Sequence, residues 1–461
     1  MKNMTLENIA KACGGTYVGS DKERAVEIKG AVTDSRQVED GYLFIPIKGA
    51  RVDGHDFIPQ VIEQGAAAVL SEKELPDCSK PYIQVKSSEQ ALKDIAEFYR
   101  EQLTIPIVGI TGSVGKTSTK EMIASVLSQK FKVLKTAGNF NNEIGLPLTL
   151  LRIREEHEVA VVEMGISDFG EMHRLAKMAK PNICVMTNIG ICHLENLKTR
   201  DGILKAKSEI FDFLKSDAHI VLNGADDKLS TIGTVKEITP VFYAIEGENQ
   251  REIDITASGI ENLGLKGMKA QLHTSKGELN VHIPIPGKHN IYNAMAATGV
   301  GMVLGLTQEE IKAGIESVET IGGRTNLLDI NGMVVIDDCY NANPVSMRAS
   351  IDVLKNGLDR KIAVLGDMGE LGEKEKQLHY EVGQYVAESK IDTLFCAGTL
   401  SEEMAKGAEE NGNCQVYYFK TRDEMLSELL QYLKTGDTVL VKASHFMEYP
   451  KIVEAVKNHG K

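Results

Sequence analysis

A glycine-rich segment that ends in lysine and threonine carries the strongest chemical signal in the sequence. Residues 109–118 read GITGSVGKTS; a short apolar run leads into them, and residues 119–130 have the pattern of an amphipathic helix. Between a buried strand and a helix, glycines let backbone N–H groups approach phosphates, whose charge the helix N-terminus favours. Lys116 would reach the terminal phosphates, and Thr117 would offer a hydroxyl to Mg²⁺. The segment predicts a nucleotide-phosphate loop; because Ile110 stands where the general pattern has glycine, a glycine-rich turn without a ligand is the alternative.

An acid at the end of a neighbouring apolar strand supplies a ligand type that Mg²⁺ prefers. Residues 159–162 are Val-Ala-Val-Val, and Glu163 follows them. The carboxyl ends of parallel strands meet at one edge of a sheet, where a carboxylate can hold Mg²⁺ directly or through water. A solvated glutamate at the strand end is the alternative. No NKxD guanine motif occurs, since Asn188 is followed by Ile189, and a GTPase switch is therefore not expected.

A lysine falls inside an apolar helical stripe. Within residues 200–214, a helical projection places Lys207 between Ile203 and Ile210, whereas Lys205 lies on the opposite face. A charged lysine without a partner is costly to bury. One solution is a side chain that extends to solvent, which the projection alone favours. The other is a neutral lysine that has taken up CO₂ as a carbamate, an anion whose two oxygens suit Mg²⁺.

The composition is that of a soluble globular protein with about three domains, since the chain has 461 residues, 42% hydrophobic and 25% charged. A net charge of −13 argues against general binding to nucleic acid or anionic membranes. The N-terminus lacks a secretory signal, and no apolar run is long enough to span a membrane. Seven cysteines without a CxxC pair indicate a reduced, cytoplasmic chain, and Cys192-His193 lacks the further ligands of a zinc site.

Three blocks with different strand and helix rhythms predict an α/β protein of three domains. Residues 1–103 mix short strands and helices, as in a small α/β domain. Residues 104–322 alternate apolar strands with helices, which is typical of a doubly wound sheet, and a period-two pattern near their end predicts an antiparallel annex. The pair Gly322-Gly323 marks a hinge, after which residues 323–461 resume βα alternation and predict a Rossmann-like domain.

Blocks along almost the whole chain resemble the Mur ligase family. They are TGSVGKTS at 111–118, NFNNEIGLPLTLL at 139–151, NIGICHLE at 188–195, AKSEIF at 206–211, VLNGADD at 221–227 and PGKHNIYNAMAA at 286–297. The resemblance implies an N-terminal uridine-nucleotide domain, a central ATPase domain with a phosphate loop, and a C-terminal Rossmann-like domain. It also implies an ATP-dependent peptide ligase that uses Mg²⁺, with two ions expected, and a role in peptidoglycan synthesis.

Three further blocks resemble one branch of the family. DSR at 34–36 is similar to the uridine-nucleotide domain of the enzymes that act late in the series of Mur ligase reactions. DDCYNANP at 337–344 and VLGDMGELG at 364–372 resemble the enzyme that adds D-alanyl-D-alanine. The partners implied are UDP-N-acetylmuramoyl-tripeptide and D-alanyl-D-alanine, with no nucleic acid and no membrane insertion; a monomer is expected. The block at 442–450, KASHFMEYP, departs from the family's KGSRGM, and His445 receives no role.

The resemblance implies the following site residues. ATP is assigned to Gly112, Ser113, Val114, Gly115, Lys116, Thr117 and Ser118, with Asn290 and Asn293 at the adenine and Arg324 and Asp338 from the third domain. The metal is assigned to Thr117, Glu163, His193 and a carbamylated Lys207. The substrates are assigned to Asp34, Ser35, Arg36, Asn139, Asn142, Tyr340, Asn341 and Asn343. Catalysis is assigned to Lys116, Lys207, His193 and Arg324.

The chemistry implied is activation of a carboxylate by ATP, because a carboxylate does not react with an amine at neutral pH. An acyl phosphate would form and the dipeptide amine would attack it, while closure of the third domain keeps water away. Two alternatives are a relative with another substrate, such as a third-residue-adding or folylpolyglutamate-type ligase, and a non-catalytic nucleotide-binding scaffold. The 34–36 and 337–344 blocks argue against the first. The presence of Lys116, Glu163, His193 and Lys207 together argues against the second.

Overall fold

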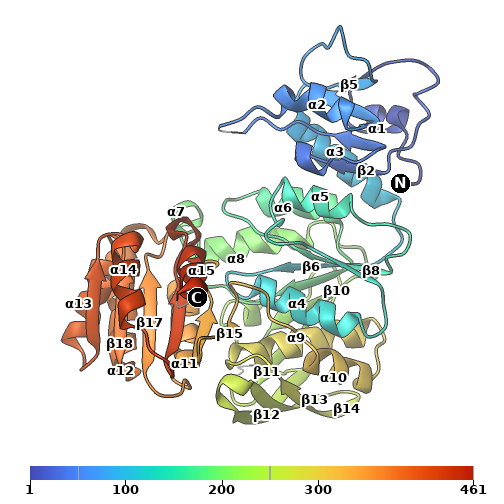
Figure 1. The fold of residues 1–461 in the computed structure, drawn as a ribbon. Helices are drawn as coiled ribbons and strands as arrows, with labels where there is room; N and C mark the ends of the chain where they lie inside the picture. The colour runs from blue at the N-terminus through green and yellow to red at the C-terminus, as the bar shows by residue number, and fades with distance from the viewer. Residues whose placement is uncertain (50, 249–250, 460–461) are drawn as a thin grey trace.

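The computed structural model describes residues 1–49, 51–248 and 251–459, which form three α/β domains, each built on one sheet (Figure 1). The first domain lies beside one end of the central domain, and the third lies at its side (Figure 1). Across these described ranges, no helix has the length and apolar character needed to cross a bilayer.

The first sheet has five strands in the order β1-β5-β4-β3-β2, parallel except where β1 meets β5. Its strands are β1 (Thr16–Val18), β2 (Gly30–Val32), β3 (Tyr42–Phe44), β4 (Ala68–Ser71) and β5 (Tyr82–Gln84). Its helices are α1 (Leu6–Ala12), α2 (Ile58–Glu63) and α3 (Ser88–Glu101). The last of these, α3, begins at a Ser87 cap and packs against α5 and α6 of the central domain.

The central sheet has nine strands in the order β14-β13-β12-β11-β10-β9-β6-β8-β7. They are β6 (Ile107–Thr111), β7 (Val133–Lys135), β8 (Val159–Glu163), β9 (Ile183–Met186), β10 (His219–Asn223), β11 (Val241–Ile245), β12 (Ile255–Asn262), β13 (Met268–Thr274) and β14 (Gly277–Ile283). The helices are α4 (Lys116–Leu127), α5 (Gly145–Leu150), α6 (Glu171–Ala179), α7 (Leu194–Leu197), α8 (Arg200–Ser208), α9 (His289–Val303) and α10 (Gln308–Glu316). Because helices cover both faces, β6, β8 and β9 are buried throughout, and their sequences are continuous apolar runs.

The third sheet has six strands in the order β15-β16-β20-β17-β18-β19, parallel except for β15. They are β15 (Asn326–Ile330), β16 (Met333–Asp337), β17 (Lys361–Gly366), β18 (Thr393–Ala397), β19 (Gln415–Phe419) and β20 (Thr438–Lys442). The helices are α11 (Pro344–Leu354), α12 (Glu375–Glu388), α13 (Ser401–Glu410), α14 (Arg422–Tyr432) and α15 (Pro450–Asn458).

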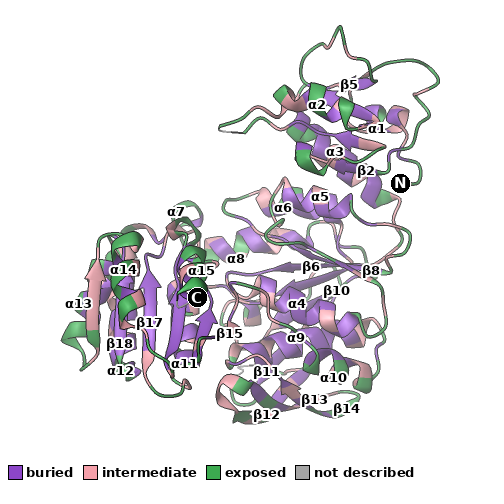
Figure 2. Ribbon diagram, in the orientation of Figure 1, coloured by how far each residue is buried: buried purple, intermediate pink, exposed green. Residues whose placement is uncertain are grey.

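The cores show which domains are joined and which are separate. Buried residues follow the strands of each sheet, and exposed residues lie on the outer helix faces (Figure 2). One continuous core joins the first domain to the central one, for example Leu92 and Ile95 with Leu175. The third domain has cores of its own, against which Ile191 and Leu265 of the central domain pack. The third domain is therefore attached through a small apolar contact, whereas the first two share their interior.

The predicted three-domain α/β architecture is confirmed, and so is the antiparallel annex, which is formed by β12, β13 and β14. The boundaries 1–103, 104–322 and 323–461 stay a prediction. The helix expected over 200–214 is shorter: α8 ends at Ser208, and a 3-10 turn follows where the Glu209 carboxylate accepts N–H bonds at the start of α6.

Candidate active site

A cavity of about 650 Å³ lies between the central and third domains, at the carboxyl ends of the central strands. Ligands of open α/β sheets bind at this edge. The phosphate loop and the segments around Asn142 and Glu163 line one side. Arg324, Asp338 and Tyr340 line the other side, so residues from two separately packed domains share the site.

The phosphate loop has the backbone that its glycines predict. Gly112 has φ +150°, and a Cβ there would lie 1.9 Å from the Thr187 hydroxyl; Gly115 has φ +83° where α4 begins. Lys116 Nζ folds back to donate to the Gly112 carbonyl at 2.8 Å. Ile110 is fully buried on β6, outside the loop proper, which explains why glycine is not needed at that position.

Glu163 is the acid that the strand pattern predicts, and it faces the phosphate loop. Its side chain accepts hydrogen bonds from the Thr117 hydroxyl at 3.0 Å and from the Asn141 amide at 2.8 Å. Asn141 was not among the predicted residues, although it belongs to the same NFNN block as Asn139 and Asn142. Asn142 lines the cavity and accepts from the Gly145 N–H, whereas Asn139 is not part of the lining.

Lys207 is buried, with 1% of its surface exposed, so the interpretation of a side chain extended to solvent is wrong. Among the described residues its ammonium makes no hydrogen bond or ion pair. Burial, with a smaller effect of the Lys116 charge, lowers the pKa of Lys207 to about 8. Lys205 is exposed, as the projection predicts. A neutral amine, which a carbamate requires, is therefore accessible near neutral pH.

His193 lies at the cavity with φ +53°, an unusual backbone for a non-glycine residue. Its Nδ1 lies 2.6 Å from the carboxylate of Glu370 in the third domain, and this close contact with His193 lowers the pKa of Glu370. In the parts of the chain that the structure covers, no three His, Cys, Asp or Glu side chains gather around one point. Glu163 and His193 would therefore need further oxygens to complete a Mg²⁺ shell, as this ion usually keeps several waters and phosphate oxygens.

Arg324 of the third domain contacts the phosphate loop of the central domain. Its guanidinium lies 3.4 Å from the Thr117 hydroxyl and 4.0 Å from the centre of the Tyr340 ring. An arginine stacked on an aromatic ring is held in place, because the cation and the ring face attract each other. The structure thus brings a predicted third-domain cation to the predicted phosphate loop.

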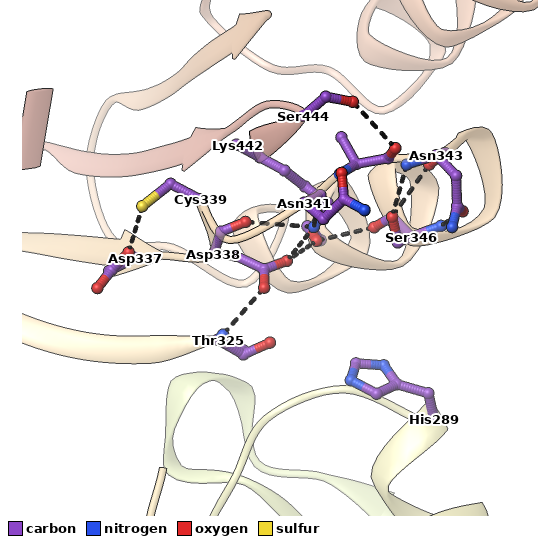
Figure 3. Close-up of polar contacts among 12 residues, drawn as sticks. His289, Thr325, Asp337, Asp338, Cys339, Asn341, Asn343, Ser346, Lys442 and Ser444 are labelled. Atoms are coloured by element: carbon purple, nitrogen blue, oxygen red, sulfur yellow. Dashed lines mark hydrogen bonds and ion pairs between the residues drawn. The ribbon is translucent and has the colours of Figure 1, made fainter. Parts of the chain in front are cut away.

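A buried polar cluster shapes the third-domain wall of the cavity (Figure 3). The Asp338 carboxylate pairs with Lys442 Nζ at 2.7 Å and accepts from the Ser350 hydroxyl and the Thr325 N–H. Lys442 also donates to the Asn341 carbonyl at 3.0 Å. His289 of the central domain lies across from this cluster (Figure 3). The carboxylate of Asp338 is therefore bound within its own domain and fixes the loop that follows β16.

The other predicted residues are placed as follows. Asn343 caps α11 in a reciprocal pair with Ser346. Asn290 and Asn293 are buried and bonded to each other, and only Asn293 lines the cavity; their assignment to adenine stays a prediction. Asp34 and Arg36 pair with each other in the first domain, and the buried Ser35 lies between them in sequence; none of the three lines this cavity.

The sequence analysis gives no role to several polar residues that line the cavity, and four of them bear directly on the site. Three of these lie within the recognised blocks 139–151 and 286–297, and the signal for the fourth is a lysine at the end of a buried strand. The four are Asn141, Glu143, His289 and Lys442. His445, to which no role was given, lies outside the lining, and its ring centre is 5.6 Å from that of Tyr340.

Comparisons with known proteins agree over the whole chain. The Mur ligase family catalytic domain matches residues 27–100, the Mur ligase middle domain matches 110–301, and the Mur ligase glutamate ligase domain matches 323–445. The UDP-N-acetylmuramoyl-tripeptide–D-alanyl-D-alanine ligases of Bacillus subtilis and Escherichia coli are 38% and 33% identical, with 98% and 100% of both chains covered. A MurF crystal structure from Acinetobacter baumannii is similar with a TM-score of 0.88 at 33% identity, covering 98% of each chain. The MurF ligase of Thermotoga maritima in complex with ADP has a TM-score of 0.79 at 30% identity, covering 93% of this chain and 97% of that one.

Replacing Lys207 with methionine is expected to stabilise the protein at neutral pH by up to about 3 kcal/mol, because a folded pKa near 8 against the ordinary 10.5 makes the buried charge costly below pH 8. Between pH 8 and 10.5 the unfolded chain binds a proton that the folded chain lacks. Wild-type stability therefore rises with pH, and the gap to Lys207→Met closes. Urea unfolding in CO₂-free buffer at several pH values measures this difference in the free energy of unfolding.

The exposed Lys205→Met is the matched control, and no such pH-dependent gap is expected for it. A Lys207→Met variant less stable than wild type at pH 7 would show that the ammonium has a stabilising partner.

Proposed function

This chain belongs to the Mur ligase family, and on that premise we propose that it joins D-alanyl-D-alanine to UDP-N-acetylmuramoyl-tripeptide with ATP as the energy source. The convergence of Lys116, Glu163, His193 and Arg324 on one cavity carries the proposal of carboxylate activation. The two full-length ligases named above support the choice of substrates. The product would be a UDP-muramoyl-pentapeptide.

The reaction proceeds in two steps. The terminal carboxylate of the tripeptide attacks the γ-phosphorus of ATP, so that an acyl phosphate forms and ADP leaves. The free amine of the dipeptide then attacks the acyl carbon, inorganic phosphate leaves, and the nitrogen gives up a proton. Negative charge spreads over the phosphoryl group in the first step, and Lys116 and Arg324 are the cations placed to offset it.

Residues around the phosphate loop fit a Mg²⁺ site. Glu163 points its carboxylate at Thr117, and the buried Lys207 nitrogen has no partner in the described chain. Addition of CO₂ to its neutral amine, with loss of a proton, would make an anionic carbamate that can bind a cation. Thr117, Glu163, His193 and the carbamate would hold one or two Mg²⁺ ions. Bound there, Mg²⁺ offsets phosphate charge and orients the acceptor carboxylate.

The substrates occupy different domains in this proposal. Asp34, Ser35 and Arg36 bind the uridine nucleotide in the first domain, and Tyr340, Asn341 and Asn343 contact the dipeptide in the third. Asn290 and Asn293 contact the adenine. Closure about the Gly322–Gly323 pair keeps water from the acyl phosphate. We place the chain in the cytoplasm as a monomer, in keeping with seven free cysteines.

The experiment that tests the function is phosphate release from MgATP with UDP-N-acetylmuramoyl-tripeptide, with and without D-alanyl-D-alanine. Release that needs both substrates is expected, with a product heavier by one dipeptide in mass spectrometry. Tripeptides ending in lysine and in diaminopimelate are both tested. Absence of release with either would overturn the substrate assignment.

Lys116→Ala is expected to reduce turnover about a hundredfold or more, because one cation on the transferring phosphoryl group is lost. Its circular dichroism spectrum and melting temperature should stay close to those of wild type, since the side chain bonds only to the Gly112 carbonyl. Lys132→Ala, at an exposed position, is the matched control and should keep full activity. Turnover of Lys116→Ala near the wild-type rate would remove the phosphate loop from the mechanism.

Lys207→Ala is expected to lose activity and to regain part of it when formate or acetate is added, because a small carboxylate can take the place of the carbamate. Phosphate release against carboxylate concentration measures the recovery. The same acids should leave Lys116→Ala inactive, since that variant lacks a cation. Failure of the acids to restore Lys207→Ala would favour a structural lysine.

A further inference from the structure

One loop connects the phosphate loop to the third domain. The side chain of Asn188 accepts from the Val114 N–H and donates to the Val114 carbonyl, both at 2.9 Å, and the Gly190 N–H donates to the Ser113 hydroxyl. Three residues after Asn188, Ile191 packs against the core of the third domain. The loop is thus bonded to the phosphate loop through Asn188 and Gly190, and it packs against the third domain through Ile191.

The polar contact of this loop with the third domain is made by His193. Its Nδ1 lies 2.6 Å from the Glu370 carboxylate. If the imidazole is neutral and carries its proton on Nδ1, the nitrogen beside this carboxylate, then the lone pair is on Nε2, and Nε2 has no partner among the residues that the structure describes. A ring oriented in this way presents a nitrogen ready to bind a metal.

Glu370 is held in place by its own domain. The Gly369 N–H donates to the Ser444 hydroxyl at 2.9 Å, and the Ser444 N–H donates to the Asp367 carbonyl at 3.1 Å. Glu370 itself has φ +60°, so the backbone at this turn takes a rarely adopted conformation. The backbone that carries the Glu370 side chain therefore follows the third domain and not the central one.

We propose that Glu370 is a positioning residue that orients His193 as a metal ligand, so that cation binding in the central domain depends on the closed position of the third domain. This inference rests on the proposed function, which places a divalent cation at His193. Carboxylates that accept the second N–H of a metal-binding histidine fix its tautomer and ring orientation. Because linkage is reciprocal, the cation in turn favours closure by the same factor.

The alternative is that Glu370 competes with the cation for His193. In that case, removal of the Glu370 carboxylate would strengthen cation binding. Two further variants separate the roles. Glu370→Gln keeps an oxygen that can accept from Nδ1, whereas Glu370→Ala removes it. The side chain of Glu370 is 63% exposed, so neither change leaves a cavity in a core.

The test measures Mn²⁺ alone binding to the full chain, from the loss of the free-ion signal in electron paramagnetic resonance. Glu370→Ala is expected to weaken Mn²⁺ binding about tenfold, and Glu370→Gln to fall between it and wild type. Glu373→Ala, an exposed acid three residues away, is the matched control and should bind as wild type. His193→Ala should weaken binding at least as much as Glu370→Ala.

Closure gives a second readout that does not depend on turnover. Mn²⁺ is expected to lower the radius of gyration in solution scattering for wild type and Glu373→Ala, but not for Glu370→Ala. Wild-type-like or tighter Mn²⁺ binding by Glu370→Ala overturns the inference, and so does unchanged binding by His193→Ala. Lack of phosphate release alongside the expected Mn²⁺ pattern would overturn the proposed function and leave the positioning role standing.

Discussion

Positive charge without matching negative charge is the constraint on which this site depends. Lys116 and Lys207 lie close enough that the charge of one depresses the pKa of the other, and neither pairs with a carboxylate in the described chain. Arg324 adds a third cation from across the cavity. A polyanion such as a nucleotide phosphate chain and a carbamate on Lys207 would supply the missing charge. Bound phosphate groups and a carbamate would therefore complete the electrostatics of the site.

Packing explains how two domains can share such a site and still separate. The first and central domains have one core, so their relation is fixed by the same apolar burial that holds each together. The third domain keeps its own cores. Its contacts with the central domain include the apolar side chains of Ile191 and Leu265, the His193–Glu370 pair, and the hydrogen bonds of Arg324 to Thr117 and of Asn262 to Asn356. Partly exposed polar contacts of this kind contribute little stability each. Domain motion is therefore the expected behaviour.

Sequence patterns predict most of the fold because the central strands are buried on both faces and read as apolar runs. The same reasoning places Glu163 and the phosphate loop, since both follow such strands directly. The same reasoning fails for Lys207, for which the helical projection favours a side chain extended to solvent. A projection shows the helix face on which a residue lies, but not whether a long side chain can reach solvent from that face. Contacts across the domain boundary, such as those of Glu370, have no periodic signal in the sequence, and only the structure reveals them.

The unusual 442–450 block illustrates how a motif can change without loss of its structural part. Lys442 fixes Asp338 and the Asn341 carbonyl, and Ser444 holds the turn that carries Glu370, so the two residues shared with the family's KGS pattern make the internal bonds. His445 and Phe446, which replace arginine and glycine, are exposed and lie outside the cavity lining. The third domain is instead anchored through Arg324 and Glu370. The absence of the arginine therefore alters the surface beside the site, while the residues that line the cavity keep their internal bonds.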